Sequence, residues 1–225
     1  NPLAVELAKL SIWLVTMSKG RPFGFLDHNL RSGNSLLGIW KIDQLVELDL
    51  RPGSDAQIRL FGRSIRDAVD QALDLRQRIR STPIRDIEDV DAMAALDAQA
   101  RVKLENVFLL ADAFVGIELA ENNARKKGAR TAVLASSADR LADGDEQMAA
   151  TIRAKARGDL AKDEPNEIPR NPFHWPLEFP EVYENEQGGF DAFVGNPPFL
   201  GGSRITGPYG TAFRNWLVIA VANGT

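Results

Sequence analysis

The sequence of 225 residues contains no cysteine and only two histidines, His28 and His174. Without cysteine the chain forms neither disulfide bonds nor thiolate zinc sites, and two histidines do not make a histidine-rich metal site. No apolar run reaches the roughly 18–20 residues that a membrane span needs, and no signal peptide is visible at the start. We therefore predict a cytoplasmic protein that binds no metal and enters no membrane.

Charge of one sign is not in large excess either. The chain has 27 Lys and Arg against 31 Asp and Glu, which gives a formal net charge of −4. This balance excludes a compact, strongly basic protein that coats nucleic acid, but it does not exclude an enzyme that touches DNA through a local surface. The hydrophobic share of 44% is that of an ordinary globular protein.

Helical periodicity dominates the first three quarters of the chain. Asn1 suits an N-cap and Pro2 the first helical turn, so we expect a helix over about residues 1–18 whose apolar stripe packs on a sheet. Further helices are expected over the seam 58–79, which Pro83 ends, and over about 87–126 and 138–160, with mixed charges and no binding stripe. The first of these has a heptad-like apolar seam, which is typical of helices that pack on one another: Ile58, Phe61, Ile65, Ala68, Ala72, Leu75 and Ile79.

Two segments outside these helices indicate a different architecture. Residues 190–195 are short, apolar and bounded by glycine, as in a buried parallel strand, and a strand–loop–strand stretch is expected over 23–37. The predicted fold class is therefore α/β: a partial Rossmann-like sheet interrupted by a helical hairpin or bundle. In this division residues 1–53 belong to the α/β domain, 54–165 form the helical insertion, and 166–225 continue the α/β domain.

The sharpest motif is Asn196-Pro197-Pro198-Phe199, directly after the expected strand. Ligands of open α/β sheets bind beyond the carboxyl ends of strands. Consecutive prolines fix the backbone and remove two donors, so the Asn196 side-chain oxygen and the Pro197 carbonyl could accept both hydrogens of a planar amino group. Phe199 could lie flat on the ring that bears this amine.

This motif resembles the catalytic motif of amino-group methyltransferases that use S-adenosylmethionine. Three further segments resemble large bacterial DNA adenine-N6 methyltransferases of the restriction–modification and phage-defence type. Residues 1–9 are similar to the segment after their second strand, residues 25–38 to their third motif, and residues 173–183 to the lead-in before the catalytic strand. The four segments stand in the family's order and cover about 70 residues, with the helical middle as a variable insertion.

The resemblance implies S-adenosylmethionine as cofactor and double-stranded DNA as partner. Asn196 and Pro197 would bind the adenine amine, with Pro198 bracing them, and Phe199 would stack on a base extruded from the duplex. Asn34 would contact the adenine ring of the cofactor, and Asn1 and Pro2 would lie beside its ribose. The family's glycine-rich first motif is absent, and the sequence starts and stops abruptly, so we expect an inactive fragment of a longer protein.

Alternatives remain at this stage. A methyltransferase for another planar amine, such as a protein glutamine amide or an RNA guanine amine, can share the Asn-Pro-Pro-aromatic motif. A helical interaction module with no catalysis is the alternative from another class. Gly33-Asn34-Ser35 could be a simple tight turn. His28 and His174 are expected to be structural or surface residues, and Trp175 and Phe179 to pack in the core.

Overall fold

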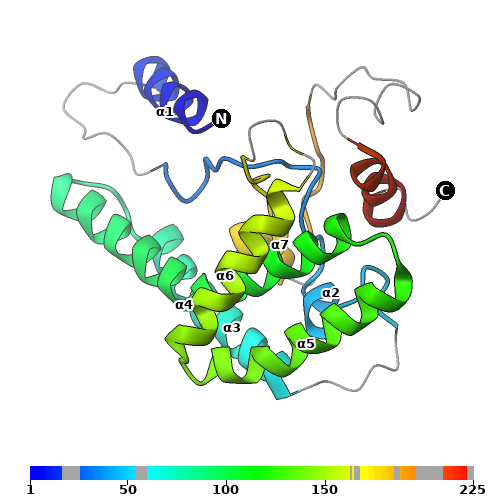
Figure 1. Cartoon of the computed structure of the whole chain (residues 1–225). Helices are drawn as coiled ribbons and strands as arrows, with labels where there is room; N and C mark the ends of the chain where they lie inside the picture. The colour runs from blue at the N-terminus through cyan, green and yellow to red at the C-terminus, as the bar shows by residue number, and fades with distance from the viewer. Residues whose placement is uncertain are drawn as a thin grey trace.

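The computed structural model describes most of the chain, and regular structure in it is helical (Figure 1). The described ranges are 1–16, 26–53, 60–162, 164, 168–184, 188–195 and 210–221. The helices are α1 (Pro2–Thr16), α2 (Ile42–Glu47), α3 (Leu60–Ser81), α4 (Ile87–Ala120), α5 (Ala124–Ala142), α6 (Glu146–Ala161), α7 (Trp175–Glu178), α8 (Pro180–Tyr183) and the π-helical turn η2 (Leu217–Val221).

The prediction of an α/β, Rossmann-like fold is wrong for this structure. Within the described ranges there is no sheet, and one isolated parallel bridge joins Asn34 to Pro172. Residues 190–195, expected as a buried strand, have no partner strand, and Val194 is 100% exposed. A strand is held by hydrogen bonds to a neighbouring strand, and no described segment supplies that neighbour. Residues 26–37 likewise form turns.

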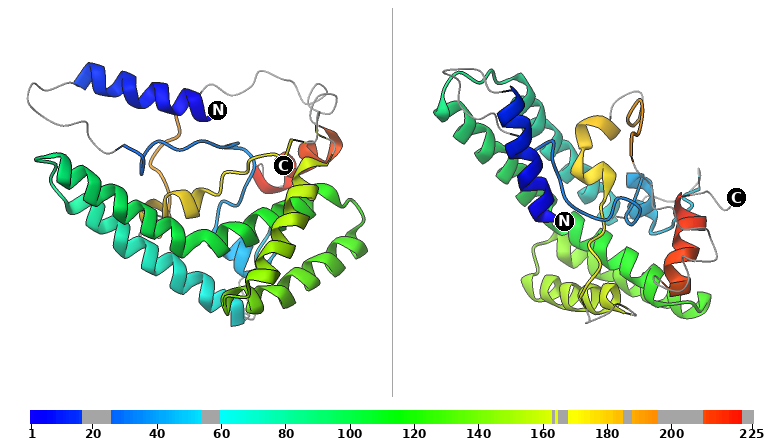
Figure 2. Two further views of the ribbon diagram at one scale, coloured as in Figure 1. Left: turned by 60° about the vertical axis from the view of Figure 1, so that its left-hand side comes forward. Right: turned by 90° about the horizontal axis from the view of Figure 1, so that it is seen from above.

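Helices α3 and α4 form a long antiparallel hairpin, which Figure 2 shows from the side. The helical seam expected in α3 is confirmed, because Phe61, Ile65, Ala72 and Ile79 are buried. Between the two helices lies Pro83, as predicted. Amphipathic helices that bury such seams against each other gain most of their stability from this packing.

The ends of α4, α5 and α6 differ from the predicted ends. One helix was expected over 87–126, but α4 stops at Ala120 and α5 starts after Asn123, whose side chain accepts a hydrogen bond from Lys126 N. The expected helix over 138–160 is interrupted at Gly144, where φ is +84°, and Asp145 caps α6. Asn and Asp favour N-cap positions, and a positive φ favours glycine, so side-chain capping outweighed continuation of the helices.

The main hydrophobic core lies around α4, which packs against α3, α5 and α6. Phe114 of α4 is fully buried in it. Leu177 of α7 and apolar residues of 39–48 join the same core. We call α3–α6, residues 60–161, the helical block.

Helix α1 lies apart from the block (Figures 1 and 2). Its expected apolar stripe does not pack on a sheet; instead Leu3, Leu7, Leu10 and Leu14 are all exposed. Among its described residues Lys9 is the buried one, and it bonds Glu6 and Asp27. Among the described helices, none is long and apolar enough to cross a membrane.

The last described segment, residues 210–221, is helical. Residues 210–216 are α-helical and continue into η2. Phe213 and Trp216 are buried in a smaller apolar cluster with Leu37 and with residues of α4 and α6. The Trp216 indole donates a hydrogen bond to Leu36 O at 3.0 Å, which joins this helix to the segment around Asn34.

Candidate functional site

Two segments that are distant in the sequence lie side by side next to the helical block. We call residues 26–40 together with residues 168–184 the frame. They include the third-motif segment and the lead-in segment of the sequence comparison. Three backbone hydrogen bonds join them: Asn34 N to Asn171 O (2.8 Å), Phe173 N to Leu37 O (2.5 Å) and Trp175 N to Ile39 O (3.2 Å).

Asn34 forms the tip of a tight turn in the frame. Its backbone carbonyl accepts from Leu37 N at 2.9 Å, and its side-chain Oδ1 accepts from Leu36 N at 3.2 Å. The side chain is exposed. The turn that the sequence suggested is therefore present, and it presents the amide of Asn34 toward solvent rather than into the core.

Two glycines allow the two halves of the frame to approach closely. A Cβ atom added at Gly38 would lie 2.2 Å from Phe173 O, and the φ of Gly38 is +145°. A Cβ atom at Gly33 would lie 2.7 Å from Phe173 Cδ2. Both distances are too short for a side chain, so the backbone pairing at this point depends on glycine.

His174 fastens the frame to α4. The ring is 1% exposed, its Nδ1 accepts from Ile39 N at 3.3 Å, and its Nε2 lies 3.0 Å from Asp112 Oδ1. Because Ile39 N–H can only donate, Nδ1 acts as the acceptor and Nε2–H donates to Asp112. The structural role predicted for this histidine is confirmed.

A cluster of aromatic rings brings residues 190–195 onto the frame. The ring centroids of Trp175 and Phe193 are 5.2 Å apart, and those of Trp40 and Trp175 are 5.6 Å apart and stacked. Phe179 and Phe190 extend the cluster at 5.5 Å. Trp175 and Phe179, expected in the core, are only partly buried. The cluster thus leaves aromatic surface open beside the backbone that leads to Gly195.

A buried network of charges ties the frame to α3 and α4. Arg31 bonds Asp97 at 2.7 Å, and its Nε lies 3.4 Å from Glu178. Arg76 lies 3.7 Å from Asp97 and 3.5 Å from Glu181. Arg76 also donates to the carbonyl of His28 at 3.1 Å. Buried charges of this kind are tolerated when each has an opposite partner, so the network fixes the frame at one position on the block.

Burial and like charges shift two pKa values in this network. Burial lowers the pKa of the Arg76 guanidinium, and the carboxylate of Glu181 opposes that shift. Burial also lowers the pKa of His28, and the neighbouring positive charge of Arg76 lowers it further. His28 is therefore held neutral inside the frame, in agreement with the structural role predicted for it.

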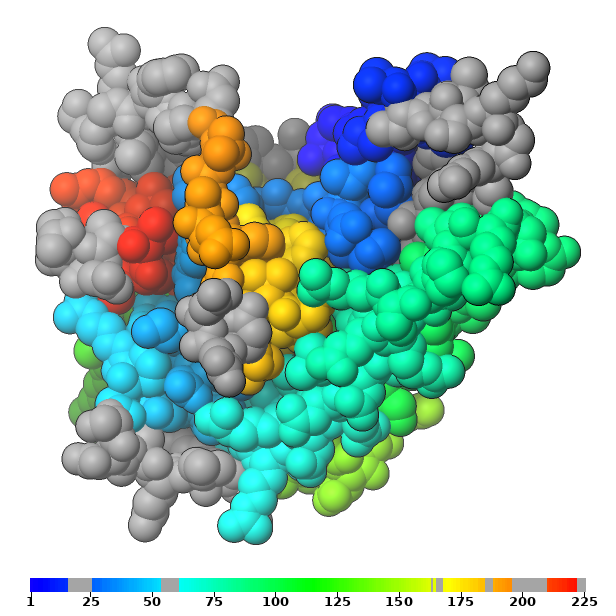
Figure 3. Space-filling model, turned by 180° about the vertical axis from the view of Figure 1, so that it is seen from behind, coloured from blue at the N-terminus to red at the C-terminus, as the bar shows by residue number. Residues whose placement is uncertain are grey.

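One cavity of about 580 Å³ opens on the frame. Figure 3 shows this side of the molecule, with residues 168–184 recessed between residues 26–40, residues 190–195 and the turn between α3 and α4. Its lining combines an aromatic wall with charged side chains. The lining residues are His28, Asn29, Leu30, Arg31, Gly33, Ser35, Arg80, Phe173, Trp175, Phe179, Glu181, Val182 and Phe190. We call it the frame cavity.

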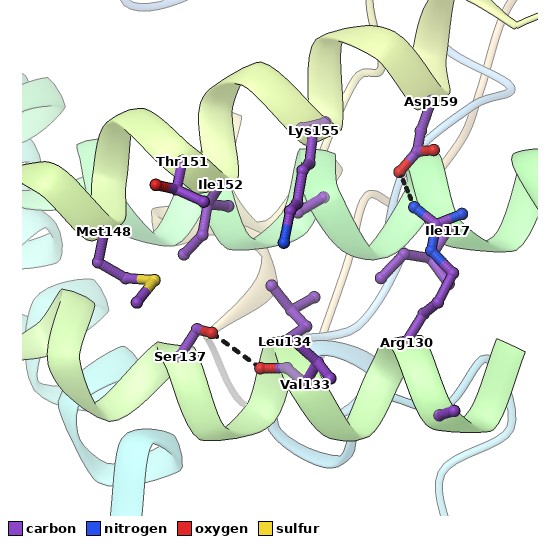
Figure 4. A pocket seen from close by; sticks show the side chains of 13 residues that line it. Ile117, Arg130, Val133, Leu134, Ser137, Met148, Thr151, Ile152, Lys155 and Asp159 are labelled. Carbon is purple, nitrogen blue, oxygen red and sulfur yellow. Dashed lines mark hydrogen bonds and ion pairs between the residues drawn. The ribbon is translucent and has the colours of Figure 1, made fainter. Parts of the chain in front are cut away.

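A second cavity lies between α5 and α6 on the far side of α4 (Figure 4). It measures about 420 Å³, and apolar side chains such as Val133, Leu134 and Ile152 make most of its wall. Arg130 and Asp159 form an ion pair at its edge. Among the described residues, no buried polar side-chain atom without a hydrogen bond lies in this cavity, and Lys155 also lines it. Its walls therefore offer mainly shape and apolar surface.

The structure describes only some of the predicted site residues. Asn196, Pro197, Pro198 and Phe199 lie outside the described residues. Asn1 caps α1, where its Oδ1 accepts from Leu3 N at 3.0 Å. Pro2 lines a cavity of about 340 Å³ between α1 and the frame, together with Ser32 and Asn171. Asn34 does not line that cavity, although Asn171, whose carbonyl accepts the Asn34 N–H, does.

Sequence reasoning missed the buried charges. Arg76 and Asp97 were taken as part of a solvated helix face, but they occupy positions of the apolar stripes of α3 and α4. Asp97 follows the buried Met93 by four residues and precedes the buried Ala100 by three. A charge at such a position is the available signal, because a charged side chain inside an apolar stripe needs a buried partner.

A comparison with protein families matches a range of the chain that includes both segments of the frame. The model of the family described as Eco57I restriction-modification methylase matches residues 1–216. No curated protein and no solved structure matches the chain. Within the described ranges, no group of three or more His, Asp or Glu side chains is arranged to hold a metal ion.

Proposed function

The chain belongs to the Eco57I restriction-modification methylase family, and from this premise we propose that it is part of a longer DNA methyltransferase that methylates the N6 amine of adenine. The observation that carries the proposal is the span of the family match. It contains all four segments of the sequence comparison, from residues 1–9 to Asn196-Pro197-Pro198-Phe199, in their family order. A restriction-modification role also favours DNA over protein glutamine or RNA guanine as the substrate.

In this proposal the motif binds the target base. Asn196 Oδ1 and the Pro197 carbonyl accept the two hydrogens of the adenine amine, and Pro198 keeps the backbone rigid. Phe199 stacks on the base, which has to leave the duplex because its amine is otherwise inside the helix. The support from the structure is indirect: the aromatic cluster holds Phe193 against Trp175, and the described backbone continues to Gly195, the residue before Asn196.

S-adenosylmethionine would supply a methyl group activated on its sulfonium. The residues proposed to hold its adenosine part are Asn34, Asn1 and Pro2. The fit is reasonable for Asn34, because its amide is exposed and its Oδ1 accepts one backbone hydrogen bond, which leaves a lone pair and the amide hydrogens for a ring edge. Pro2 lines the cavity between α1 and the frame, where a neighbouring group can rest against it.

The test is transfer of radiolabelled methyl groups from S-adenosylmethionine to DNA by the protein that contains this chain. Asn196→Ala removes one of the two acceptors of the amine. We expect label on adenine with the wild type and a loss of at least about a hundredfold in rate with the variant. Phe199→Ala is expected to lose activity, and Phe199→Trp to keep part of it, because a flat ring is retained.

Asn122→Ala is the matched control, since Asn122 is exposed in the loop between α4 and α5. It should methylate at the wild-type rate. Label that appears on cytosine would contradict adenine as the substrate. Full incorporation by the Asn196→Ala protein would remove the proposed role of the motif.

A further inference from the structure

The cavity between α5 and α6 has features that the proposed methyl transfer does not use. We infer that it binds a small molecule with an aliphatic chain and one carboxylate at its end, and that the ammonium group of Lys155 pairs with this carboxylate. The described lining residues all come from α4, α5 and α6, so they include no residue of the frame.

The walls of the cavity suit an aliphatic chain. Ala113 and Ile117 of α4 line the cavity and are buried, and so are Leu134 of α5 and Ile152 of α6. Val133 also lines it and is 56% exposed. A hydrocarbon chain that covers this surface removes apolar area of the protein and of the ligand from water, which favours binding.

The size of the cavity favours a small molecule over a helix of a partner protein. One turn of α-helix with its side chains is about 5.4 Å long and about 10 Å wide, which corresponds to a volume of about 400 Å³. The whole cavity, at about 420 Å³, therefore equals about one helical turn. Pockets for small molecules begin at about 300 Å³.

Lys155 gives the cavity one charged side chain that is open to a ligand. Figure 4 shows this side chain extending from α6 toward α5, across the space between the two helices. Within the described part of the chain, Lys155 makes no hydrogen bond and no ion pair. Asp159, one turn further along α6, is paired with Arg130 instead. An anion that enters the cavity would therefore find a charged donor in Lys155.

The charged lining residues select a ligand with a single negative charge. Arg130 and Lys155 are positive and Asp159 is negative, so the described lining carries a net charge of +1. An organic cation would meet the positive charge of Lys155. A phosphate monoester with two negative charges would leave one of them unmatched, because Arg130 is already paired with Asp159. One carboxylate matches Lys155 alone.

Two hydroxyl groups in the lining do not compete with Lys155 as donors. Ser137 Oγ donates to Val133 O at 2.8 Å, and Thr151 Oγ1 donates to Gln147 O at 2.9 Å. Each hydroxyl has one hydrogen, so neither has a second one for a ligand. The charged end of the ligand is therefore expected at Lys155, with the chain along the apolar wall.

Calorimetric titration of the full chain tests the charge and the chain of the ligand. Octanoate, octan-1-ol and octylammonium share one chain length and differ at the end group. We expect octanoate to bind about tenfold more tightly than octan-1-ol, and octylammonium to bind most weakly. Hexanoate should bind about tenfold more weakly than octanoate, because each buried methylene group raises affinity by up to about fourfold. Equal binding of octanoate and the alcohol, or of octanoate and hexanoate, would overturn the inference.

Methionine methyl signals in an NMR spectrum locate the ligand. The chain contains three methionines. Met148 lines the cavity, whereas Met93 is buried in a separate cluster with Ile79. Octanoate should shift the signal of Met148 and leave that of Met93 unchanged, with both signals assigned through Met148→Leu and Met93→Leu. An unchanged Met148 signal would place the ligand elsewhere and overturn the inference.

Lys155→Met removes the charge and keeps an apolar side chain of similar length. It should lower the affinity for octanoate to that for octan-1-ol while the alcohol binds as before, which a loss of structure would not produce. Lys155→Arg should restore the preference. Lys126→Met, an exposed change outside the described lining, is the matched control and should bind both ligands like the wild type.

Ala129→Phe tests the cavity itself. Ala129 is exposed and lines the cavity, so a ring at this position takes up its volume without entering the core. It should weaken octanoate and octan-1-ol by the same factor. The inference is overturned if folded Lys155→Met keeps its preference for octanoate, or if Ala129→Phe leaves both affinities unchanged.

An anionic membrane lipid is a second source of an aliphatic chain with a charged end. The chain of such a lipid lies inside the bilayer, so we expect no cosedimentation of the protein with vesicles of phosphatidylglycerol. Cosedimentation that Lys155→Met abolishes would assign the site to a membrane surface and overturn a free carboxylate as the ligand. None of these measurements requires methyl transfer, so they are independent of the proposed function.

Discussion

Phe114 in the helical block and Trp175 in the frame both lie close to the apolar core around α4, but they are held in different ways. Phe114 is fully buried among aliphatic side chains of α3, α5 and α6. Trp175 is partly exposed, stacks on Trp40 and donates its indole N–H to Ser35 O at 2.9 Å. The block is stabilised by repetitive apolar packing, whereas the frame depends on individual contacts, some within the frame and some to α3 and α4.

This difference indicates which part of the molecule tolerates amino-acid substitutions. Apolar packing tolerates exchange of one aliphatic residue for another if volume is kept. Loss of one partner of a buried ion pair leaves an uncompensated charge, and a side chain at Gly38 would collide with the backbone of Phe173. The frame, which carries the candidate site, should therefore be sensitive to single changes at these contacts, and three changes test how the two regions are held.

The largest effect is expected for Phe114→Ala, which removes a fully buried ring from the core around α4. Loss of buried area and the cavity left behind should lower the free energy of unfolding by about 3–5 kcal/mol. Chemical denaturation measures this change. Phe193→Ala is the matched control, because this ring is 60% exposed, and its effect should be less than about 1 kcal/mol. Equal losses would show that burial of the ring does not decide how much it contributes to stability.

A somewhat smaller effect is expected for Arg76→Met, which leaves Glu181 and the carbonyl of His28 without their partner from α3. Unpairing a buried charge should cost about 3 kcal/mol. Hydrogen exchange should then show lost protection at the frame amides of Phe173 and Trp175, with the amides of α4 retained.

The control for this change is Arg78→Met on the exposed face of the same helix, which should leave exchange unchanged. Uniform loss of protection across α3 and α4 would mean that Arg76 supports the block and not the frame.

The smallest effect is a dependence on pH through His28. Burial, and then Arg76, lower its pKa from 6.5, with Arg31 and Arg80 acting in the same direction and Asp97 against it. Between the lowered pKa and 6.5 the unfolded chain binds more protons than the folded chain, so stability falls as the pH falls through this window.

Thermal unfolding between pH 7 and pH 5 measures the effect, and the difference from His28→Gln isolates it from other groups. Glu184 is one such group, because burial raises the pKa of its carboxyl. The variant should show a flatter pH profile than the wild type. Profiles that coincide would mean that protonation of His28 does not open the frame.

The sequence predicted the helical block well because its signal is local. The seam that includes Phe61, Ile65 and Ile79 is buried as its spacing implied. The separate α5 was missed because the cap at Asn123 is a single side chain competing with a long helical pattern. The sheet was predicted from the apolar run at 190–195, but strand formation depends on a partner that periodicity cannot reveal.

The candidate site was less predictable. Resemblance singled out both segments of the frame, and the structure brings them together through the bridge at Asn34 and Pro172. Asp97 and Glu181 carry no local signature of a shared network, because the residues that join them are far apart in the sequence and meet only in the fold. Charges within apolar stripes mark where such a network begins, but not which partners complete it.

Helix α4 also fixes the spacing of two contacts that it makes with the frame. Its Asp97 contacts Arg31, and its Asp112 contacts His174. Fifteen residues of α-helix span about 22 Å and bring the two carboxylates to within about 60° of each other around the axis. One residue inserted between them would rotate Asp112 by about 100° and break the register. Length changes should thus be excluded from this stretch and accumulate at the loops after α4 and α5, where relatives could lengthen the block without disturbing the site.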